Sequence, residues 1–389
     1  MIPLRYHLRS LFERRAMAGT AALGVALSVL VLGMVVALRT GLAAALGRSG
    51  AMDVAMVLRA GSEAELTSQF PAADVARVLV APSIQAGPDG QPLAEAEVVV
   101  TMSFDRAGGD GISSLVLRGI GPRSLALRAG LRIAQGRAPA PGADEAMIGS
   151  ALVGRFAGLR LGGQLPLGLR PLTVVGVLDA RGGVVDSEIW ADRDAVQRAT
   201  GREALMSSVR VRLRAPSELE PLRSRVEQDR SLELHVESEP AYFERQRDRS
   251  AAFVLGIGTL VCAGFALAAL LGAAVTLHAL VAGRKTEIGV LRALGFSASQ
   301  VLASFLLESV MVSLAGGALG IAGALALSGL ELSLVNPANF SEVVFSLEPS
   351  LGMLGGAGAM ALGMGLCGGL VPALRAARTR PAEAIRDRD

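Results

Sequence analysis

The stretch GRKTEIGVLRALGFSASQVLASFLLESVMVSLAGGALG, residues Gly283–Gly320, joins a short charged segment to a long apolar one without an intervening proline. In the charged segment, Ile288, Leu291 and Leu294 fall on one face of a helix, which predicts a short amphipathic helix. The apolar segment contains a single acid, Glu308, and another apolar run lies directly before the stretch. The sequence therefore predicts two membrane spans joined by a stiff helix. The polar residues of this helix are Arg284, Lys285, Glu287 and Arg292.

The composition points to a membrane protein. Of the 389 residues, 51% are hydrophobic and only 4% are aromatic, unlike an ordinary soluble domain. The formal net charge is +3, and no basic run is interleaved with aromatic residues, so the sequence predicts no nucleic-acid partner. The two cysteines lie in apolar stretches and the three histidines in separate regions, so neither type indicates a metal site.

Four apolar segments are long enough to cross a hydrocarbon core of roughly 30 Å at about 1.5 Å per residue. These predicted spans are residues 17–39, 250–281, 299–330 and 350–373. The remaining segments outside the large domain are a basic amphipathic helix at 1–16, the helical loop at 282–298, a short external loop at 331–349 and a tail at 374–389. A cleaved signal peptide is the alternative for the first span, although the run is longer than a usual signal core.

Between the first two spans, residues 40–249 have a globular composition and alternate strand-like with helical runs. The predicted fold is therefore four transmembrane α-helices with a large α+β extracytoplasmic domain between spans one and two. Residues 241–250 are charged and favour a helix, so we expect one helix to run from this domain into the second span. The predicted strands are Val54–Arg59, Val98–Phe104, Leu115–Ile120, Leu172–Leu178 and Val209–Leu213, and the predicted helices are Ala72–Leu79, Ser150–Ala157, Asp192–Ala199 and Glu218–Gln228.

The distribution of basic residues predicts the orientation. Arginine and lysine gather before the first span, in the loop between spans two and three, and after the fourth span. No lysine or arginine lies between Arg292 and Arg375. The positive-inside rule then places both termini and the central loop in the cytoplasm and the large domain outside.

The sequence indicates no catalytic site. Its single lysine, Lys285, follows an arginine and not a glycine-rich turn, so a Walker phosphate loop is excluded. The GRSG sequence around Ser49 imitates the motif of intramembrane serine proteases, but the nearest candidate base, His278, lies at the opposite end of another span. The acids Asp179, Asp186, Glu188 and Asp192 lie close together, and we interpret them as a solvated, turn-rich surface rather than a catalytic pair.

Glu308 is notable because an ionisable group within a membrane span is costly. We favour a structural role, in which it reaches the interface or supports a helix contact. Coupling to protons or substrate is the alternative. The glycines Gly316, Gly317 and Gly320 of the third span, and Gly369 among the many glycines of the fourth, permit close helix approach.

Three motifs resemble one family. Residues 284–295, RKTEIGVLRALG, match the RxxEIGxxRAxG signature of the FtsX-like domain in ABC permeases of the MacB, LolC and FtsX type. The continuation with Glu308 and the three third-span glycines is similar to the same domain. The end of the chain, with Gly369 and Pro372 in GLVPALRAAR at 369–378 and then PAEAIR at 381–386, resembles its GxxPAxRAAxxxPxEALR tail. The FtsX-like region is thus expected at 282–389. The region 40–249 resembles a MacB-like periplasmic core domain in two short segments, Gly136-Arg137 and residues 174–177.

The resemblance implies a non-enzymatic permease subunit that works as a dimer, with a second copy or a paralogue. A separate cytoplasmic ATPase dimer would bind ATP and magnesium, so no cofactor is expected on this chain. ATP-driven closure would move the spans and, through the second one, the outer domain. The implied uses are tripartite efflux with a periplasmic adaptor, lipoprotein or lipid extraction, or signalling to a cell-wall hydrolase. The residues implied to dock on the ATPase are Arg284, Lys285, Glu287, Ile288, Leu291, Arg292, Leu294 and Gly295, and those implied in helix packing and coupling are Glu308, Gly316, Gly317, Gly320, Gly369 and Pro372.

Overall fold

The structure is a computed structural model of the whole chain. It describes residues 15–47, 50–109, 111–128, 130–168, 170–282, 294–335, 342–347 and 349–378. The chain divides into two compact units. We call the first the helical unit; it comprises Met1–Thr40, Val254–Leu330 and Leu347–Asp389. The second comprises Gly41–Phe253 and Glu331–Ser346, and we call it the sheet domain.

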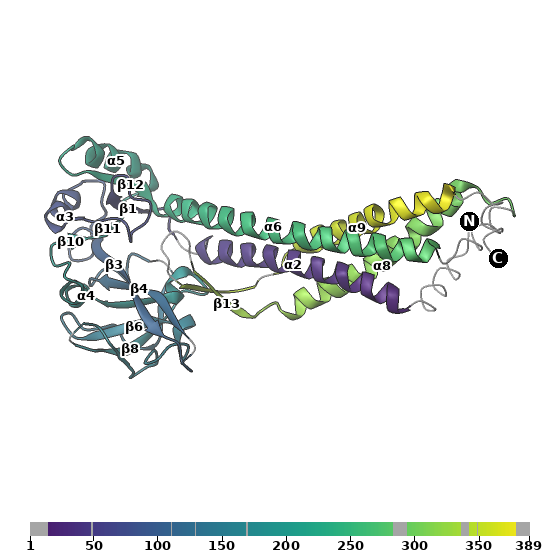
Figure 1. Cartoon of the computed structure of the whole chain (residues 1–389). Helices are drawn as coiled ribbons and strands as arrows, with labels where there is room; N and C mark the ends of the chain where they lie inside the picture. The colour runs from purple at the N-terminus through teal and green to yellow at the C-terminus, as the bar shows by residue number, and fades with distance from the viewer. Residues whose placement is uncertain are drawn as a thin grey trace. The chain divides into compact units, whose positions relative to one another are not determined.

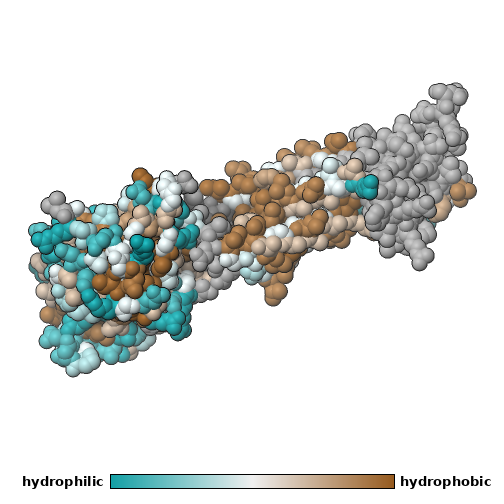
Figure 2. All heavy atoms as spheres, turned by 90° about the horizontal axis from the view of Figure 1, so that it is seen from below, coloured by the Kyte–Doolittle hydropathy of each residue, from teal (hydrophilic) through white to brown (hydrophobic). Residues whose placement is uncertain are grey.

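Four long helices build the helical unit (Figure 1). They are α2 (Arg15–Gly47), α6 (Glu239–Ala282), α8 (Ala298–Ala326) and α9 (Leu351–Arg378). The first part of α2 and the last part of α6 belong to this unit, and the other ends of both helices belong to the sheet domain. Figure 2 shows hydrophobic side chains over the face of the helical unit seen in that view. Such a surface suits a lipid environment.

Three helical segments in the described part of the chain are long and apolar enough to cross a membrane. They are Ala18–Leu46, Ala298–Ala326 and Leu351–Leu370. The predicted span at 250–281 lies within α6, where the described apolar segment, Gly256–Gly272, is shorter than the other three. The helix itself runs without interruption from Glu239 to Ala282, which confirms the predicted continuity between the charged segment at 241–250 and the apolar run.

The sheet domain contains a mixed sheet of ten strands, in the order β12-β1-β11-β3-β4-β9-β6-β8-β5, with β7 paired to β8. Most neighbours are antiparallel, but β4 with β9 and β6 with β8 are parallel. A second, small sheet pairs β2 with β10. The strands are β1 (Val54–Arg59), β2 (Phe70–Pro71), β3 (Ala94–Asp105), β4 (Ile112–Ile120), β5 (Arg132–Gly136), β6 (Glu145–Gly149), β7 (Gln164–Leu165), β8 (Leu172–Asp179), β9 (Glu188–Asp192), β10 (Leu205–Met206), β11 (Ser208–Arg212) and β12 (Leu234–Ser238).

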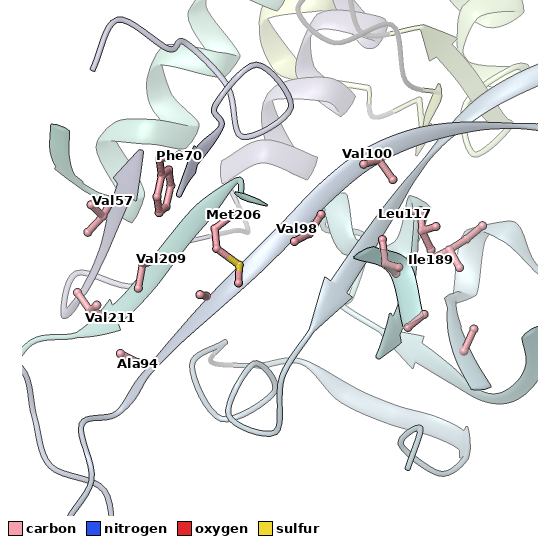
Figure 3. Packing of buried hydrophobic residues seen from close by; sticks show 14 of the residues in the cluster. Val57, Phe70, Ala94, Val98, Val100, Leu117, Ile189, Met206, Val209 and Val211 are labelled. Atoms are coloured by element: carbon pink, nitrogen blue, oxygen red, sulfur yellow. The ribbon is translucent and has the colours of Figure 1, made fainter. Parts of the chain in front are cut away.

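Three helices accompany these sheets, namely α3 (Ala72–Leu79), α4 (Arg193–Thr200) and α5 (Leu219–Gln228). The side chains between sheet and helices form one continuous apolar core. In Figure 3, Val57, Val98 and Val209 from three neighbouring strands lie in this core with Phe70 and Met206. Alternate residues of the strands supply it because successive side chains of a strand point to opposite faces.

The predicted strands are all present, and three of the four predicted helices are correct within a residue or two. The helix predicted at Ser150–Ala157 is wrong. Only a single 3₁₀ turn forms, at Ser150–Leu152. Gly154 and Gly158 then adopt positive φ angles of 73° and 79°, which a right-handed helix cannot accommodate. Apolar spacing alone could not reveal these two turns.

The segment predicted as a short external loop at 331–349 contains a β-hairpin. Strands β13 (Glu331–Val335) and β14 (Glu342–Ser346) pair in antiparallel register. The backbone N–H of Val344 donates to the hydroxyl of Ser187 at 2.9 Å, and Arg106 forms an ion pair of 2.7 Å with Glu342. The hairpin is therefore part of the sheet domain, although 77 residues of sequence, Val254 to Leu330, separate it from the rest of that domain.

Candidate functional site: helix contacts and a buried charge cluster

Most of the residues predicted to dock on an ATPase lie outside the described part of the chain. These are Arg284, Lys285, Glu287, Ile288, Leu291 and Arg292. The structure resumes at Leu294, which is 72% exposed, and Gly295 has a φ of 96° that favours glycine. Helix α8 then begins with a capping box, in which Ser297 accepts from the backbone of Gln300 and the Gln300 side chain accepts from the backbone of Ser297.

Two of the predicted packing glycines bring α8 close to α2. A Cβ atom added at Gly316 would lie 2.3 Å from the carbonyl oxygen of Ala22, and one added at Gly320 would lie 2.5 Å from that of Ala26. Both distances are far below van der Waals contact, so only glycine allows the backbones this approach. Small residues at such spacing permit helices to pack closely in lipid.

Gly317 and Gly369 bring α8 close to α9. A Cβ atom added at Gly317 would lie 2.6 Å from Cβ of Ala361, and one at Gly369 would lie 2.7 Å from Cβ of Ser309. The Ser309 hydroxyl also donates to the carbonyl of Gly365 at 2.7 Å. Such an interhelical hydrogen bond satisfies a polar group that has no access to water. Pro372 lies within α9, but the described part of the structure does not include its side chain.

Glu308 lies beside these contacts. Its side chain is only 2% exposed, and it belongs to the buried stripe of α8 together with Phe305 and Ser309. The helical spacing of this stripe places Glu308 inside the bundle and not on the helix surface. Of the two structural roles named from the sequence, this position fits the helix contact and not a side chain that reaches out to the membrane interface.

The sheet domain contains a feature that the sequence analysis missed. Seven charged side chains, all less than 9% exposed, gather on β3, β4, β9 and β11, on the loop after β1, on the turn after β4 and at the start of α6. Burying charges is costly unless they are paired and hydrogen-bonded. We call this set the buried charge cluster; it consists of Arg118, Arg128, Arg210, Glu65, Glu97, Glu188 and Glu239.

Arg118 occupies the centre of the cluster, and all five of its N–H groups are used. Its Nε donates to Glu188 at 2.9 Å. Its Nη1 donates to Glu65 and to Glu97, each at 2.9 Å. Its Nη2 donates to Glu65 at 3.0 Å and to Glu188 at 2.9 Å. A guanidinium is the only side chain that can supply five such donors in a plane.

Arg128 and Trp190 extend the cluster on one side. Arg128 donates to both oxygens of Glu97, at 2.7 and 2.5 Å, and its guanidinium carbon lies 4.5 Å from the centre of the Trp190 ring. The indole N–H of Trp190 donates to Glu188 at 2.7 Å. Trp190, the only tryptophan in the chain, is thus fixed by a cation–π contact and a hydrogen bond.

On the other side, the cluster holds the first turns of α6. Arg210 forms a hydrogen-bonded ion pair with Glu239, the first residue of α6, and a second pair with Glu65 at 3.6 Å. The other oxygen of Glu239 accepts from the backbone N–H of Ala51 at 2.8 Å. One turn later, the Tyr242 hydroxyl accepts from the backbone N–H of Glu65 at 3.3 Å. The start of α6 is therefore held by buried polar contacts.

These surroundings shift the pKa values of the cluster. Burial alone would raise the pKa of Glu65, but the charges of Arg118 and Arg210 outweigh burial and lower it to about 2. Burial likewise opposes ionisation of Glu97, and Arg128 overcomes it, so the pKa of Glu97 lies well below its ordinary value. Burial lowers the pKa of Arg210 to about 10. These carboxylates and this guanidinium are therefore charged at neutral pH.

The interpretation of Asp179, Asp186, Glu188 and Asp192 as a solvated surface is wrong for two of the four. Glu188 belongs to the buried charge cluster. Asp186 is 3% exposed and accepts from the backbone N–H groups of Ala180 and Gly182, both at 2.7 Å. Asp192, by contrast, caps the N-terminus of α4. The clustering of acids in the sequence did not reveal which of them face arginines on other strands.

Two family models match the chain. The model described as MacB-like periplasmic core domain matches residues 17–229, and the model described as FtsX-like permease C-terminal matches residues 259–381.

Named relatives are ABC transporter proteins. The uncharacterized ABC transporter permease MJ1507 of Methanocaldococcus jannaschii is 25% identical over 235 residues, which are 59% of this chain and 58% of that protein. The pyoverdine export ATP-binding/permease protein PvdT of Pseudomonas entomophila is 30% identical over 262 residues, which are 63% of this chain and 38% of that protein. The chain thus spans only part of the length of these relatives.

Among solved structures, the periplasmic region of MacB from Actinobacillus actinomycetemcomitans is 16% identical, with a TM-score of 0.38, over 51% of this chain and 93% of that one. The MacB-like model alone covers more than half of the chain, and the FtsX-like model covers most of the remainder. The chain belongs to the family of ABC transporter permeases that combine a MacB-like periplasmic core domain with an FtsX-like permease region.

Proposed function

We propose that this chain is the non-catalytic permease subunit of an ABC transporter, which couples ATP hydrolysis on a separate ATPase to conformational change of its sheet domain. Four spans cross a bacterial inner membrane, formed by α2, the apolar part of α6, α8 and α9. Both termini and residues 282–298 are cytoplasmic, and the sheet domain is periplasmic. The basic residues that flank the spans support this orientation.

One observation carries the proposal. Helix α6 runs without interruption from Glu239, in the buried charge cluster, to Ala282, directly before the predicted docking segment. A helix of 44 residues is about 66 Å long at about 1.5 Å per residue, roughly twice the thickness of a hydrocarbon core. A stiff rod whose first turn is fixed by buried ion pairs can transmit a displacement that a flexible linker would absorb.

The ATPase is proposed to dock on the segment Arg284–Gly295. The helix predicted here from the sequence would place Ile288, Leu291 and Leu294 on an apolar face beside a charged one. ATP and magnesium bind to the ATPase, and two permease copies, or this chain and a paralogue, form the membrane part. The name of PvdT describes an ATP-binding/permease protein, which supports an ATPase as the functional partner of this permease region.

Tripartite export is the proposed use, with a periplasmic adaptor as a further partner. It is favoured because the relative PvdT is described as an export protein. Lipoprotein or lipid extraction and activation of a cell-wall hydrolase are the competing uses. Purification of the native complex, followed by mass spectrometry, distinguishes them. An adaptor supports export, whereas a lipoprotein carrier or a cell-wall hydrolase in its place contradicts it.

The docking role is tested by replacing Glu287 and Arg292 together with glutamine. We expect co-purification of the ATPase with the tagged permease to fall at least tenfold, while membrane insertion is unchanged. The matched control replaces Glu220 and Arg223, an ion pair of α5 in which Glu220 is 68% exposed, with glutamine. The control should co-purify the ATPase at the level of the unmodified chain. Undiminished co-purification of the Glu287/Arg292 variant would refute docking at this segment.

A further inference from the structure

The sheet domain contains a cavity of about 440 Å³. This volume lies within the range of roughly 300–1,000 Å³ typical of small-molecule sites. One part of its wall is apolar and includes Leu46, Leu66, Leu131, Val184, Val185 and Phe243. The other part is formed by the buried charge cluster, from which every member except Glu97 lines the cavity. An apolar chamber with a few convergent polar groups is the usual form of a ligand site.

The walls include residues of three segments that lead from the sheet domain into the helical unit. Leu42 and Leu46 belong to the end of α2, Glu239 and Tyr242 to the start of α6, and Glu342 to the hairpin between α8 and α9. All of these residues are part of the sheet domain. A molecule in the cavity would therefore contact α2, α6 and β14 at once.

The polar wall determines which molecule fits. The wall carries four arginines, Arg118, Arg128, Arg181 and Arg210, and four glutamates, Glu65, Glu188, Glu239 and Glu342, so its formal charges balance. An additional ion would remain without a countercharge in a largely apolar chamber, which is strongly unfavourable. One donor is still available. Nε of Arg210, in a side chain 2% exposed, has no hydrogen-bond partner among the described residues.

We propose that this cavity binds a small uncharged amphiphile. Its apolar body lies against Leu66, Leu131 and Val185, and one hydrogen-bond-accepting oxygen lies at Nε of Arg210. A buried hydrogen-bond donor without a partner is energetically costly. An acceptor that binds this donor therefore contributes more binding free energy than an acceptor that only replaces bulk water at an exposed donor. The binding site itself does not depend on the proposed ATPase coupling, and its test uses the chain without an ATPase.

The test is photolabelling of the full chain in lipid nanodiscs. The probe is a monoacylglycerol with a diazirine in its acyl chain; two matched probes carry a carboxylate or a trimethylammonium group in place of the glycerol. After irradiation and digestion, mass spectrometry locates the label. We expect the uncharged probe to label the peptides that contain Leu131, Val185 and Phe243, and the two charged probes to label them at least fivefold less.

Two variants that fill the cavity make the test specific. Val185→Phe and Leu66→Phe add bulk at half-buried positions of the wall, and each should reduce labelling of these peptides at least fivefold. The control, Val80→Phe, makes the same exchange at a residue that is 67% exposed and outside the cavity, and should leave labelling unchanged. Trp190 fluorescence verifies that each variant is folded. Label confined to the transmembrane helices, equal labelling by a charged probe, or undiminished labelling of both folded cavity variants would overturn the proposal.

Discussion

Arg210 and Glu239 form an ion pair in which the two side chains are only 2% and 4% exposed. Arg210 lies on β11, in the interior of the mixed sheet, and Glu239 is the first residue of α6. The pair therefore connects the sheet to the helix that continues into the helical unit. Because both charges are removed from water, the loss of one partner leaves the other buried and uncompensated.

Glu239→Gln is expected to reduce the free energy of unfolding by roughly 3 kcal/mol, the lower end of the range for breaking a buried ion pair. The amide keeps the shape but removes the charge opposite Arg210. Thermal unfolding in nanodiscs, followed through the fluorescence of Trp190, measures the change. Glu220→Gln is the control, because Glu220 is 68% exposed and its pair with Arg223 should contribute less than about 1 kcal/mol. Equal stability of the two variants would argue against the anchoring role of Glu239.

The buried carboxylates predict how stability depends on pH. In the folded chain the pKa of Glu65 is about 2, compared with an ordinary value of 4.5. A carboxylate whose pKa is lowered by folding stabilises the fold at pH values above its unfolded pKa, and this contribution is lost as the pH falls through the folded pKa. We expect the free energy of unfolding to decline between about pH 4.5 and 2. In Glu65→Gln this decline of the free energy of unfolding should be shallower. Chemical denaturation at several pH values measures it. If the free energy of unfolding falls equally steeply with pH in both proteins, the ion pairs of Glu65 do not stabilise the fold.

Glycine-to-alanine substitutions in α8 and in α9 are expected to have opposite effects on stability. Gly320→Ala would place Cβ 2.5 Å from the carbonyl of Ala26, so α2 and α8 must separate, and we expect a loss of about 1–3 kcal/mol. Gly363→Ala, in α9, meets no atom within 4 Å, and alanine favours a helix over glycine by up to about 1 kcal/mol. Thermal inactivation of the two purified variants should therefore shift in opposite directions. A stabilising Gly320→Ala would exclude close packing of α8 on α2.

Glu308→Gln distinguishes the structural role of this acid from a chemical one. The amide preserves the volume and one hydrogen-bond-accepting oxygen of a side chain that lies inside the bundle, so ATP-coupled activity with the partner ATPase should remain within about twofold of normal. ATPase stimulation in reconstituted vesicles is the measurement. If the variant complex still assembles and hydrolyses ATP, but the permease no longer stimulates this hydrolysis, Glu308 instead has a role in proton or substrate coupling.

Local patterns in the sequence account for most of the elements. Strand β1 and helix α3 begin and end at the predicted residues, because the apolar residues of Val54–Arg59 and Ala72–Leu79 have the spacing of a strand and a helix. The hairpin β13–β14 was missed for a different reason. Its short runs, ELSLV and EVVFS, are compatible with strands, but their position between two spans favoured a connecting loop.

The buried charge cluster could not be derived from local patterns. A single arginine in an apolar strand, such as Arg118 in LVLRGI, is as compatible with a solvent-facing position as with a buried one. Its partners Glu65 and Glu188 are 53 and 70 residues away in sequence, so only the pairing of β4 with β9 and its other neighbours reveals them. The sequence shows only that four separate strands each contain a charged residue. Whether these residues are buried and paired depends on how the strands are arranged in the sheet.

The hairpin at Glu331–Ser346 also affects how the protein is made. Ser187 receives its hydrogen bond from Val344, 157 residues later, and Arg106 pairs with Glu342 over a separation of 236 residues. During synthesis, Ser187 and Arg106 can therefore form these two contacts only after α8 and the hairpin have emerged from the ribosome. The hairpin can therefore complete the sheet domain only after α8, a helix of the other unit, has been synthesised, so the last step of domain folding follows the synthesis of most of the chain.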